Sequence, residues 1–203
     1  MAISTYAELK ASIQNWSKRP DVLSVIDDLI DLTESDLWQR LKIRDMEARA
    51  NATADTTSRF LALPTGFLEM RRLSLINGSL RYEVNSTTPN SMNVKSSGIP
   101  VYFTVTSQLE FDRTPASAYT VEMEYYKSLD ALSASNTANA VLTRFPMIYL
   151  YGALKHFGNW SMNDDIVAKY SSLFDQEIDQ ANKIDRRGRF GPAPAMRTER
   201  PTP

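Results

Sequence analysis

The sequence predicts an α+β protein, in which a helical bundle formed by N-terminal and C-terminal helix pairs carries an inserted, mainly antiparallel β-rich subdomain. Three observations lead to this prediction. Apolar residues recur every three or four positions near both ends of the chain, a spacing typical of amphipathic helices. Short runs of alternating apolar and polar residues, separated by turn residues, lie between them. The final residues are rich in proline and poor in apolar side chains, which predicts an extended C-terminal arm.

These patterns divide the 203 residues into N-terminal helices at 1–45, a β-rich insertion at 46–128, C-terminal helices at 129–187 and a basic, proline-rich arm at 188–203. The length is enough for one sizeable core that carries a subdomain. The formal net charge of -1 predicts neither nucleic acid nor a membrane as a partner of the whole chain. The absence of cysteine excludes disulfides, thiol catalysis and cysteine-bound metal.

Two helices are expected at the N-terminal end. The first spans Thr5–Lys18, because Ser4 or Thr5 can cap it and Pro20 stops it. The second begins after Asp21, its expected cap, and continues to about Ile43. One face of the second helix carries five acidic residues and no basic residue: Asp27, Asp28, Asp31, Glu34 and Asp36. This acidic face is either a solvated helix surface or a surface that repels nucleic acid or meets a basic partner.

The middle of the chain predicts short strands at Glu47–Thr53, Ser58–Leu63, Glu69–Ile76, Ser79–Val84, Val101–Thr106, Leu109–Asp112 and Tyr119–Tyr126. Asn77-Gly78 between two of these runs is the strongest hairpin signal. Thr88–Met92 predicts a capped helical turn with proline at its first position. Glu122 and Glu124 share one strand face, as catalytic carboxylates can, but alternating acids on an exposed strand are common.

A connection at Leu129–Ala140 leads to two amphipathic helices between Thr143 and Arg189. Pro146 suits the first turn of the first helix, and Met162–Asp165 suits the turn and the N-cap of the second. The apolar stripe of the first helix contains Met147, Leu150, Leu154 and Phe157, and that of the second contains Ile166, Tyr170, Leu173, Phe174, Ile178 and Ala181. Neither helix can bury its stripe alone, so each needs a partner.

No arrangement of residues in the chain predicts catalysis. His156 is the only histidine, and no motif places a serine or an acid beside it. Motifs for nucleotide, zinc or nucleophilic-serine sites are also missing, so we expect no enzyme activity, no cofactor and no metal. The C-terminal helices carry more aromatic residues than one stripe needs. We therefore expect three of them to contribute to a subunit interface: Tyr149, Tyr151 and Trp160.

Basic residues crowd the end of the last predicted helix and continue beyond it. They either complement the helix dipole or form a flexible arm that orders on the surface of a partner. Nucleic acid is another possible partner of such an arm, although the chain as a whole is slightly acidic. The candidate binding residues of the arm are Arg186, Arg187, Arg189, Phe190, Arg197 and Arg200.

Four segments together resemble the head-to-tail adaptor proteins of tailed bacteriophages. These proteins are also called head-completion or connector proteins, and the tail tubular protein of short-tailed phages is a relative. The resemblance extends in the same order over nearly the whole chain. The segments are Ala2–Leu9 (AISTYAEL), the loop Leu63–Leu73 (LPTGFLEMRRL), the strand Tyr119–Tyr126, and Leu142–Arg189 with its YLYGAL and DRR runs.

The resemblance implies a virion structural protein at the head–tail junction, made in the host cytoplasm. It implies a ring, dodecameric in the best-known members, that joins the portal to the tail nozzle and continues the DNA channel. The segment Arg186–Pro203 would then reach the portal, and the acidic face would keep passing DNA from sticking to the channel wall. The alternative functions are a nucleic-acid-binding module that uses the basic arm and, ranked last, a small hydrolase built on the sheet carboxylates.

Overall fold

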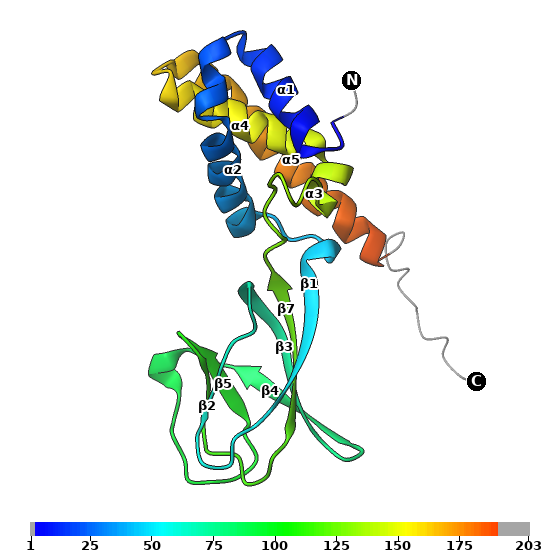
Figure 1. Ribbon diagram of the computed structural model, residues 1–203. Helices are drawn as coiled ribbons and strands as arrows, with labels where there is room; N and C mark the ends of the chain where they lie inside the picture. The colour runs from blue at the N-terminus through cyan, green and yellow to red at the C-terminus, as the bar shows by residue number, and fades with distance from the viewer. Residues whose placement is uncertain (1–2, 191–203) are drawn as a thin grey trace, which may run out of the picture. The chain divides into compact units, whose positions relative to one another are not determined.

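The computed structural model describes residues 3–190 and shows an α+β protein, which confirms the predicted class. The chain divides into two compact units. A helical unit contains the chain up to Asp45 and again from Asp130, and a sheet unit consists of Met46–Leu129. Figure 1 shows the α-helices in the first unit and the strands in the second.

The helical unit has five α-helices within the described residues. They are α1 (Tyr6–Ser17), α2 (Ile26–Arg40), α3 (Ala140–Arg144), α4 (Pro146–Trp160) and α5 (Asp164–Phe190). The cap predicted for the first helix is confirmed, because the Thr5 side chain accepts a hydrogen bond from the Glu8 N–H and the Glu8 carboxylate accepts one from the Thr5 N–H. Lys18 then adopts a left-handed conformation with φ 52° and ends α1.

The second predicted helix begins later and ends earlier than its sequence pattern indicates. Pro20–Ser24 forms a short 3-10 helix instead, in which Asp21 pairs with the Arg19 guanidinium rather than capping α2. Val25 has φ -123° and ψ 0°, which interrupts the helical backbone before Ile26. At the other end, Leu41 is extended, so the apolar residues that follow are buried without being helical. The apolar spacing therefore continues beyond both ends of α2, because flanking apolar residues are buried without being part of this helix. The pattern alone does not show where the helix begins and ends.

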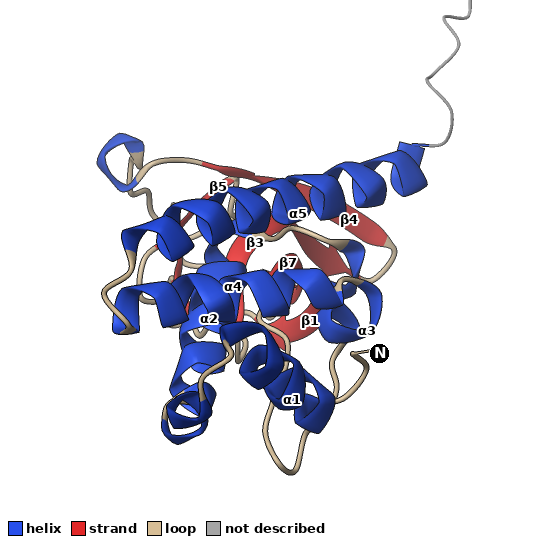
Figure 2. Ribbon diagram, turned by 90° about the horizontal axis from the view of Figure 1, so that it is seen from above, coloured by secondary structure: helices blue, strands red, loops and turns tan. Residues whose placement is uncertain are grey.

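Helix α4 is the centre of the helical unit. It packs against α1, α2 and α5, and Figure 2 shows it between α5 and α1. Pro146 occupies its first turn, as predicted. The prediction of a single buried stripe is wrong, because Ile148, Tyr149 and Ala153 are buried as well, whereas Met147 is exposed. A helix with neighbours on three sides needs apolar residues around most of its circumference.

The sequence pattern also misses α3. Asn139 caps this short helix by accepting a hydrogen bond from the Leu142 N–H at 2.9 Å. The chain leaves helical geometry at Phe145, with φ -135° and ψ 58°, and α4 begins at Pro146. At the other end of α4, the predicted cap of α5 is confirmed, because the Asn163 side chain accepts a hydrogen bond from the Ile166 N–H at 3.2 Å.

The sheet unit contains one mixed sheet with the strand order β1-β7-β3-β4-β5-β6-β2. Its pairings are antiparallel except between β4 and β5, which are parallel. The Asn77-Gly78 hairpin is confirmed between β3 and β4, with Gly78 at φ 60°. The strands are β1 (Glu47–Thr53), β2 (Phe60–Leu61), β3 (Phe67–Asn77), β4 (Leu80–Ser86), β5 (Tyr102–Val105), β6 (Leu109–Phe111) and β7 (Thr120–Lys127).

The core of this unit lies on one face of the central strands. On β7, Val121, Met123 and Tyr125 are buried and alternate with Glu122 and Glu124, as the sequence predicts. They pack with side chains from the neighbouring strands, which include Leu73, Leu75, Val84, Phe103, Leu109 and Phe111. The strand predicted over Ser58–Leu63 shrinks to Phe60–Leu61. The predicted turn is present as a 3-10 helix at Pro89–Ser91, although the Thr88 side chain does not cap it.

Candidate interaction surfaces of the helical unit

The predicted acidic face of α2 is divided between exposed and paired carboxylates. Asp28 and Asp31 are exposed, and no ion pair is recorded for either of them within residues 3–190. Asp27 accepts a hydrogen bond from the Tyr6 hydroxyl at 2.8 Å and lies 2.7 Å from the Lys10 ammonium. Hydrogen bonds from Lys10 and Tyr6 lower the pKa of the Asp27 carboxyl. Helix α1 therefore brings a cation to this face at Asp27, which the sequence of α2 alone does not show.

Asp36 is also paired, with two side chains of α4. Its carboxylate lies 2.5 Å from the Lys155 ammonium and 3.1 Å from Nε2 of His156. Burial alone would raise the pKa of Asp36, but the hydrogen bonds and charges of these two partners outweigh it and lower the pKa. Burial and the Lys155 charge lower the pKa of His156, against the opposing effect of Asp36. The only histidine thus joins α2 to α4 through Asp36.

Glu34 lies in the interior and not on the acidic face. Its side chain is 3% exposed, and Oε1 accepts hydrogen bonds from the Leu132 N–H at 2.9 Å and from the Tyr149 hydroxyl at 2.8 Å. The Asn139 amide donates a third hydrogen bond, to the Tyr149 hydroxyl, at 2.7 Å. Burial is the main cause of a raised pKa for Glu34. Helical spacing explains this position, because Glu34 lies on the same inward side of α2 as the buried residues Ile30 and Leu37.

This hydrogen-bond network also corrects the predicted subunit interface. Tyr149 is fully buried, and its hydroxyl donates a hydrogen bond to the Glu34 carboxylate, so it cannot contact another subunit. Tyr151 is half-buried, and Trp160 is 41% exposed with the Arg19 guanidinium 5.4 Å from the centre of its ring. These two residues remain candidates for an interface.

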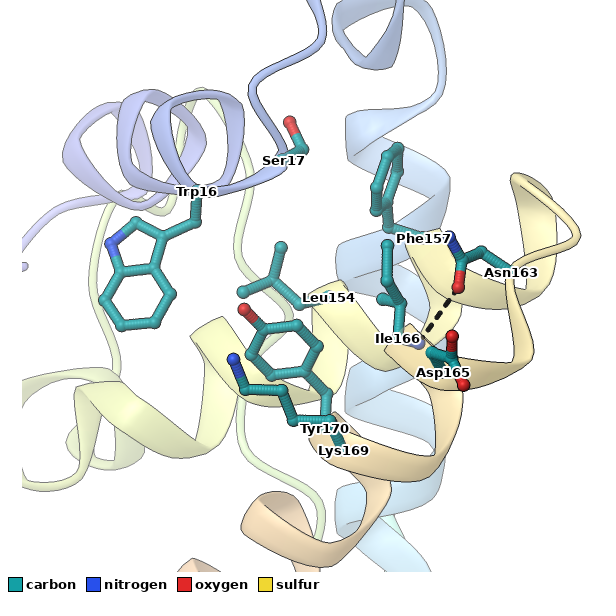
Figure 3. Close-up of a pocket in the computed structure, with 9 residues that line it drawn as sticks. All are labelled: Trp16, Ser17, Leu154, Phe157, Asn163, Asp165, Ile166, Lys169 and Tyr170. Atoms are coloured by element: carbon teal, nitrogen blue, oxygen red, sulfur yellow. Dashed lines mark hydrogen bonds between the residues drawn. The ribbon is translucent and has the colours of Figure 1, made fainter.

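A pocket of about 250 Å³ opens between α1, α4 and the first turns of α5. We call it the aromatic pocket. Figure 3 shows Trp16 on one side, Ile166 on the other, and Leu154 and Tyr170 between them. Tyr151, which is not part of the lining, connects two aromatic residues of the pocket, since its ring centre lies 6.2 Å from that of Trp16 and 6.0 Å from that of Tyr170. The residues that line the pocket are Trp16, Ser17, Leu154, Phe157, Asn163, Asp165, Ile166, Lys169 and Tyr170.

The sequence does not reveal this pocket, because the spacing of Leu9, Ile13 and Trp16 places all three on one apolar stripe of the first helix. In the structure Trp16 is 48% exposed, whereas Leu9 and Ile13 of the same stripe are fully buried. The surplus of aromatic residues in the C-terminal helices is the one signal in the sequence that points toward such a surface.

The basic residues at the end of the chain begin on a helix. Lys183, Arg186 and Arg187 are exposed on the last turns of α5, where the helix dipole favours positive charge. Because α5 continues to Phe190, the prediction of an extended arm from residue 188 is wrong for residues 188–190, which include Arg189. Arg197 and Arg200 lie outside the described residues.

Glu122 and Glu124 of the sheet unit form ion pairs with arginines of other strands. Arg49 on β1 lies 2.8 Å from Glu124 on β7, and Arg81 on β4 pairs with Glu122. Such cross-strand pairs stabilise a sheet. Within residues 3–190, no cluster of three or more histidine or acidic side chains is suited to hold a metal ion. In the same range, no helix combines the length and the apolar character that a membrane span requires.

Comparison with known proteins gives one family. The family model described as SU10 adaptor protein matches residues 4–198 and therefore covers both units. None of the curated proteins with which the chain was compared matches it.

Proposed function

We propose that this chain, which belongs to the SU10 adaptor protein family, forms an adaptor ring that joins the portal to the tail nozzle of a phage particle. The family is one of phage structural adaptors, so the chain is a structural component of the virion. The ring would continue the DNA channel between its two neighbours. The observation that carries this proposal is the family match over residues 4–198, because it covers nearly the whole chain in one family.

Exposed apolar side chains on the helical unit support assembly into a ring. Met162, at the turn between α4 and α5, is 93% exposed, and Trp160 is close to it in the sequence. Large apolar groups that are left in water favour contact with another protein surface. In our proposal Tyr151 and Trp160 contribute to the contact between neighbouring copies, and the ring contains twelve copies.

Asp28 and Asp31 are the residues that we propose to face the DNA channel. Both are exposed on α2, whereas Asp27, Glu34 and Asp36 are engaged inside the subunit. Tight binding of DNA phosphates requires lysine and arginine. A wall that presents carboxylates would therefore repel the DNA backbone and let it pass.

The basic end of α5 is the proposed contact with the portal. Lys183, Arg186 and Arg187 are exposed there. Complementary charge speeds association and selects the partner. We therefore expect an acidic surface on the portal at the position that this end meets.

The proposal can be tested with the purified chain and its portal protein. Electron microscopy of the mixture is expected to show a ring of this chain on one end of the portal. The double variant Arg186→Glu and Arg187→Glu should remain folded and lose docking. A matched control, Lys95→Glu, reverses an exposed charge in the sheet unit and should dock normally. If no ring formed on the portal, or if the double variant docked like the wild type, the portal contact proposed here would be wrong.

A second candidate function is nucleic-acid binding by the same basic end. The exposed side chains of Lys183, Arg186 and Arg187 favour it. Binding of labelled duplex DNA should then weaken steeply as salt is added, because phosphate contacts release counterions. The Arg186→Glu and Arg187→Glu variant should abolish it. Salt-sensitive DNA binding without portal docking would favour this second function over the adaptor.

A further inference from the structure

We propose that the aromatic pocket binds the proline-rich segment Pro192–Met196 of a second copy of this chain. The proposal concerns contact between copies of the chain and does not depend on docking to a portal. It assigns an occupant to a pocket that sequence reasoning does not predict. Four arguments support it: the chemistry of the pocket, the composition of the segment, the charge at the rim and the distance that the chain can span.

The pocket has the composition of a proline-binding groove. Trp16 from α1 forms one wall, Phe157 and Leu154 come from α4, and Tyr170 comes from α5. Proline-rich peptides bind aromatic-lined grooves, because their rings stack on the aromatic faces and their extended helix is formed before binding. Trp16 is half-exposed and supplies the open aromatic face on which a proline ring can stack, whereas Tyr170, Phe157 and Leu154 are almost entirely buried.

The segment after α5 has the matching composition. Residues 191–196 read Gly-Pro-Ala-Pro-Ala-Met, with prolines at alternate positions and no charged residue. Arg197 follows directly. Asp164 and Asp165 are exposed at the start of α5, and Asp165 lines the pocket. The arginine can therefore lie beside these carboxylates while the prolines occupy the apolar part of the pocket. Lys169 is on the same rim, so we expect the arginine at the aspartate side.

The segment cannot reach the pocket of its own subunit. The pocket extends along α5 only to Tyr170, and α5 ends at Phe190. At 1.5 Å per residue, the helix between these two residues spans about 30 Å. Pro194 lies four residues after Phe190, so even a fully extended chain carries it only about 14 Å. The segment can therefore fill the pocket only in another copy, which gives a head-to-tail contact of the kind that closes into rings.

The test uses a fluorescent synthetic peptide that covers residues 191–203, titrated into the full-length protein and followed by anisotropy. We expect saturable binding. Trp16→Ala should weaken it about tenfold or more, since aromatic anchors dominate contacts of this kind. The matched control is Phe60→Ala, which removes an exposed aromatic side chain of the sheet unit that does not line the pocket and should leave peptide binding unchanged. A peptide with Pro192→Ala and Pro194→Ala should also bind at least about tenfold more weakly.

Several results would overturn the proposal. One is a peptide that does not bind. Another is equal binding by the wild type and a folded Trp16→Ala variant. If that variant does not fold, the double-alanine peptide decides alone, because it leaves the protein unchanged, and equal binding of the two peptides would refute the role of the prolines. The proposal would also be refuted if added salt abolished binding while neither Trp16→Ala nor the double-alanine peptide weakened it. That result would show a purely electrostatic contact.

Discussion

The packing around Gly152 gives the sharpest prediction about stability. Gly152 lies on α4 at its contacts with α2 and α5. A Cβ at this position would be 2.3 Å from Cγ2 of Thr33 and 2.9 Å from Cε2 of Phe174. Both neighbours are fully buried, so neither can move into solvent. We therefore expect Gly152→Ala to destabilise the helical unit.

The size of the effect follows from two opposing contributions. Alanine gains about 1 kcal/mol over glycine in a helix interior. Overpacking of a core costs about 1–3 kcal/mol. The upper end applies here, because Thr33 is β-branched and its hydroxyl already donates a hydrogen bond to the Leu29 carbonyl at 2.8 Å, which holds its rotamer. The net loss is therefore about 2 kcal/mol, which corresponds to a fall in Tm of roughly 4–8 °C for a chain of this length.

The assay is thermal unfolding followed by the helical circular dichroism signal. Gly188→Ala is the matched control: it lies on α5, a Cβ there has no neighbour within 4 Å, and we expect no loss of stability. The variant Thr33→Ser removes Cγ2, the closest atom, so combining it with Gly152→Ala should cost less than the sum of the two single changes. A Gly152→Ala protein as stable as the wild type would refute the packing argument.

Two further predictions concern buried carboxyls and pH. Because burial raises the pKa of Glu34, the folded protein binds that proton more tightly than the unfolded chain, and stability falls as pH rises from the ordinary carboxyl range through the raised value. Glu34→Gln should flatten this fall in urea unfolding between about pH 4 and 8, and identical pH profiles would contradict it. In the sheet unit, burial opposes ionisation of Asp112, but hydrogen bonds from Arg113 and from the Val101 and Tyr102 N–H groups outweigh it and lower its pKa. Ionised Asp112 therefore stabilises the fold above the ordinary carboxyl pKa, and this stabilisation is lost as pH falls. Asp112→Asn should lower the free energy of unfolding by about 2–3 kcal/mol near neutral pH and by less in acid. An equal loss at both pH values would contradict a lowered pKa for Asp112.

Features that depend on a few neighbouring residues could be predicted from the sequence. Thr5 and Glu8 indicate the start of α1, Asn77-Gly78 indicates the hairpin, and Pro146 indicates the start of α4. Each of these signals acts through backbone geometry or a hydrogen bond within a few residues, so no tertiary contact is needed to interpret it. The parallel pairing of β4 with β5 is different, because it depends on the path of the chain after β4 and not on either strand alone.

The candidate sites were harder to predict, because the deciding partners are distant in the sequence. Tyr149 is separated by 115 residues from Glu34, and His156 by 120 residues from Asp36. A helical pattern shows that α2 carries acids, but it cannot show that α1 and α4 bring Lys10 and Lys155 to them. For the same reason, residue type alone could not distinguish the buried Tyr149 from the exposed Trp16.

The partners of the α2 acids change the form of the channel hypothesis. Five carboxylates per subunit are reduced to two, Asp28 and Asp31, that are exposed and have no recorded ion pair within the described residues. In one subunit two exposed charges have little effect, because salt screens them over about 8–10 Å. In the proposed ring of twelve copies, the same two residues would place about two dozen carboxylates around one opening, where neighbouring charges can lie within that screening length. Repetition around the ring would then repel the DNA backbone, which the acidic face of a single subunit does not. The channel hypothesis therefore needs only Asp28 and Asp31 from each subunit.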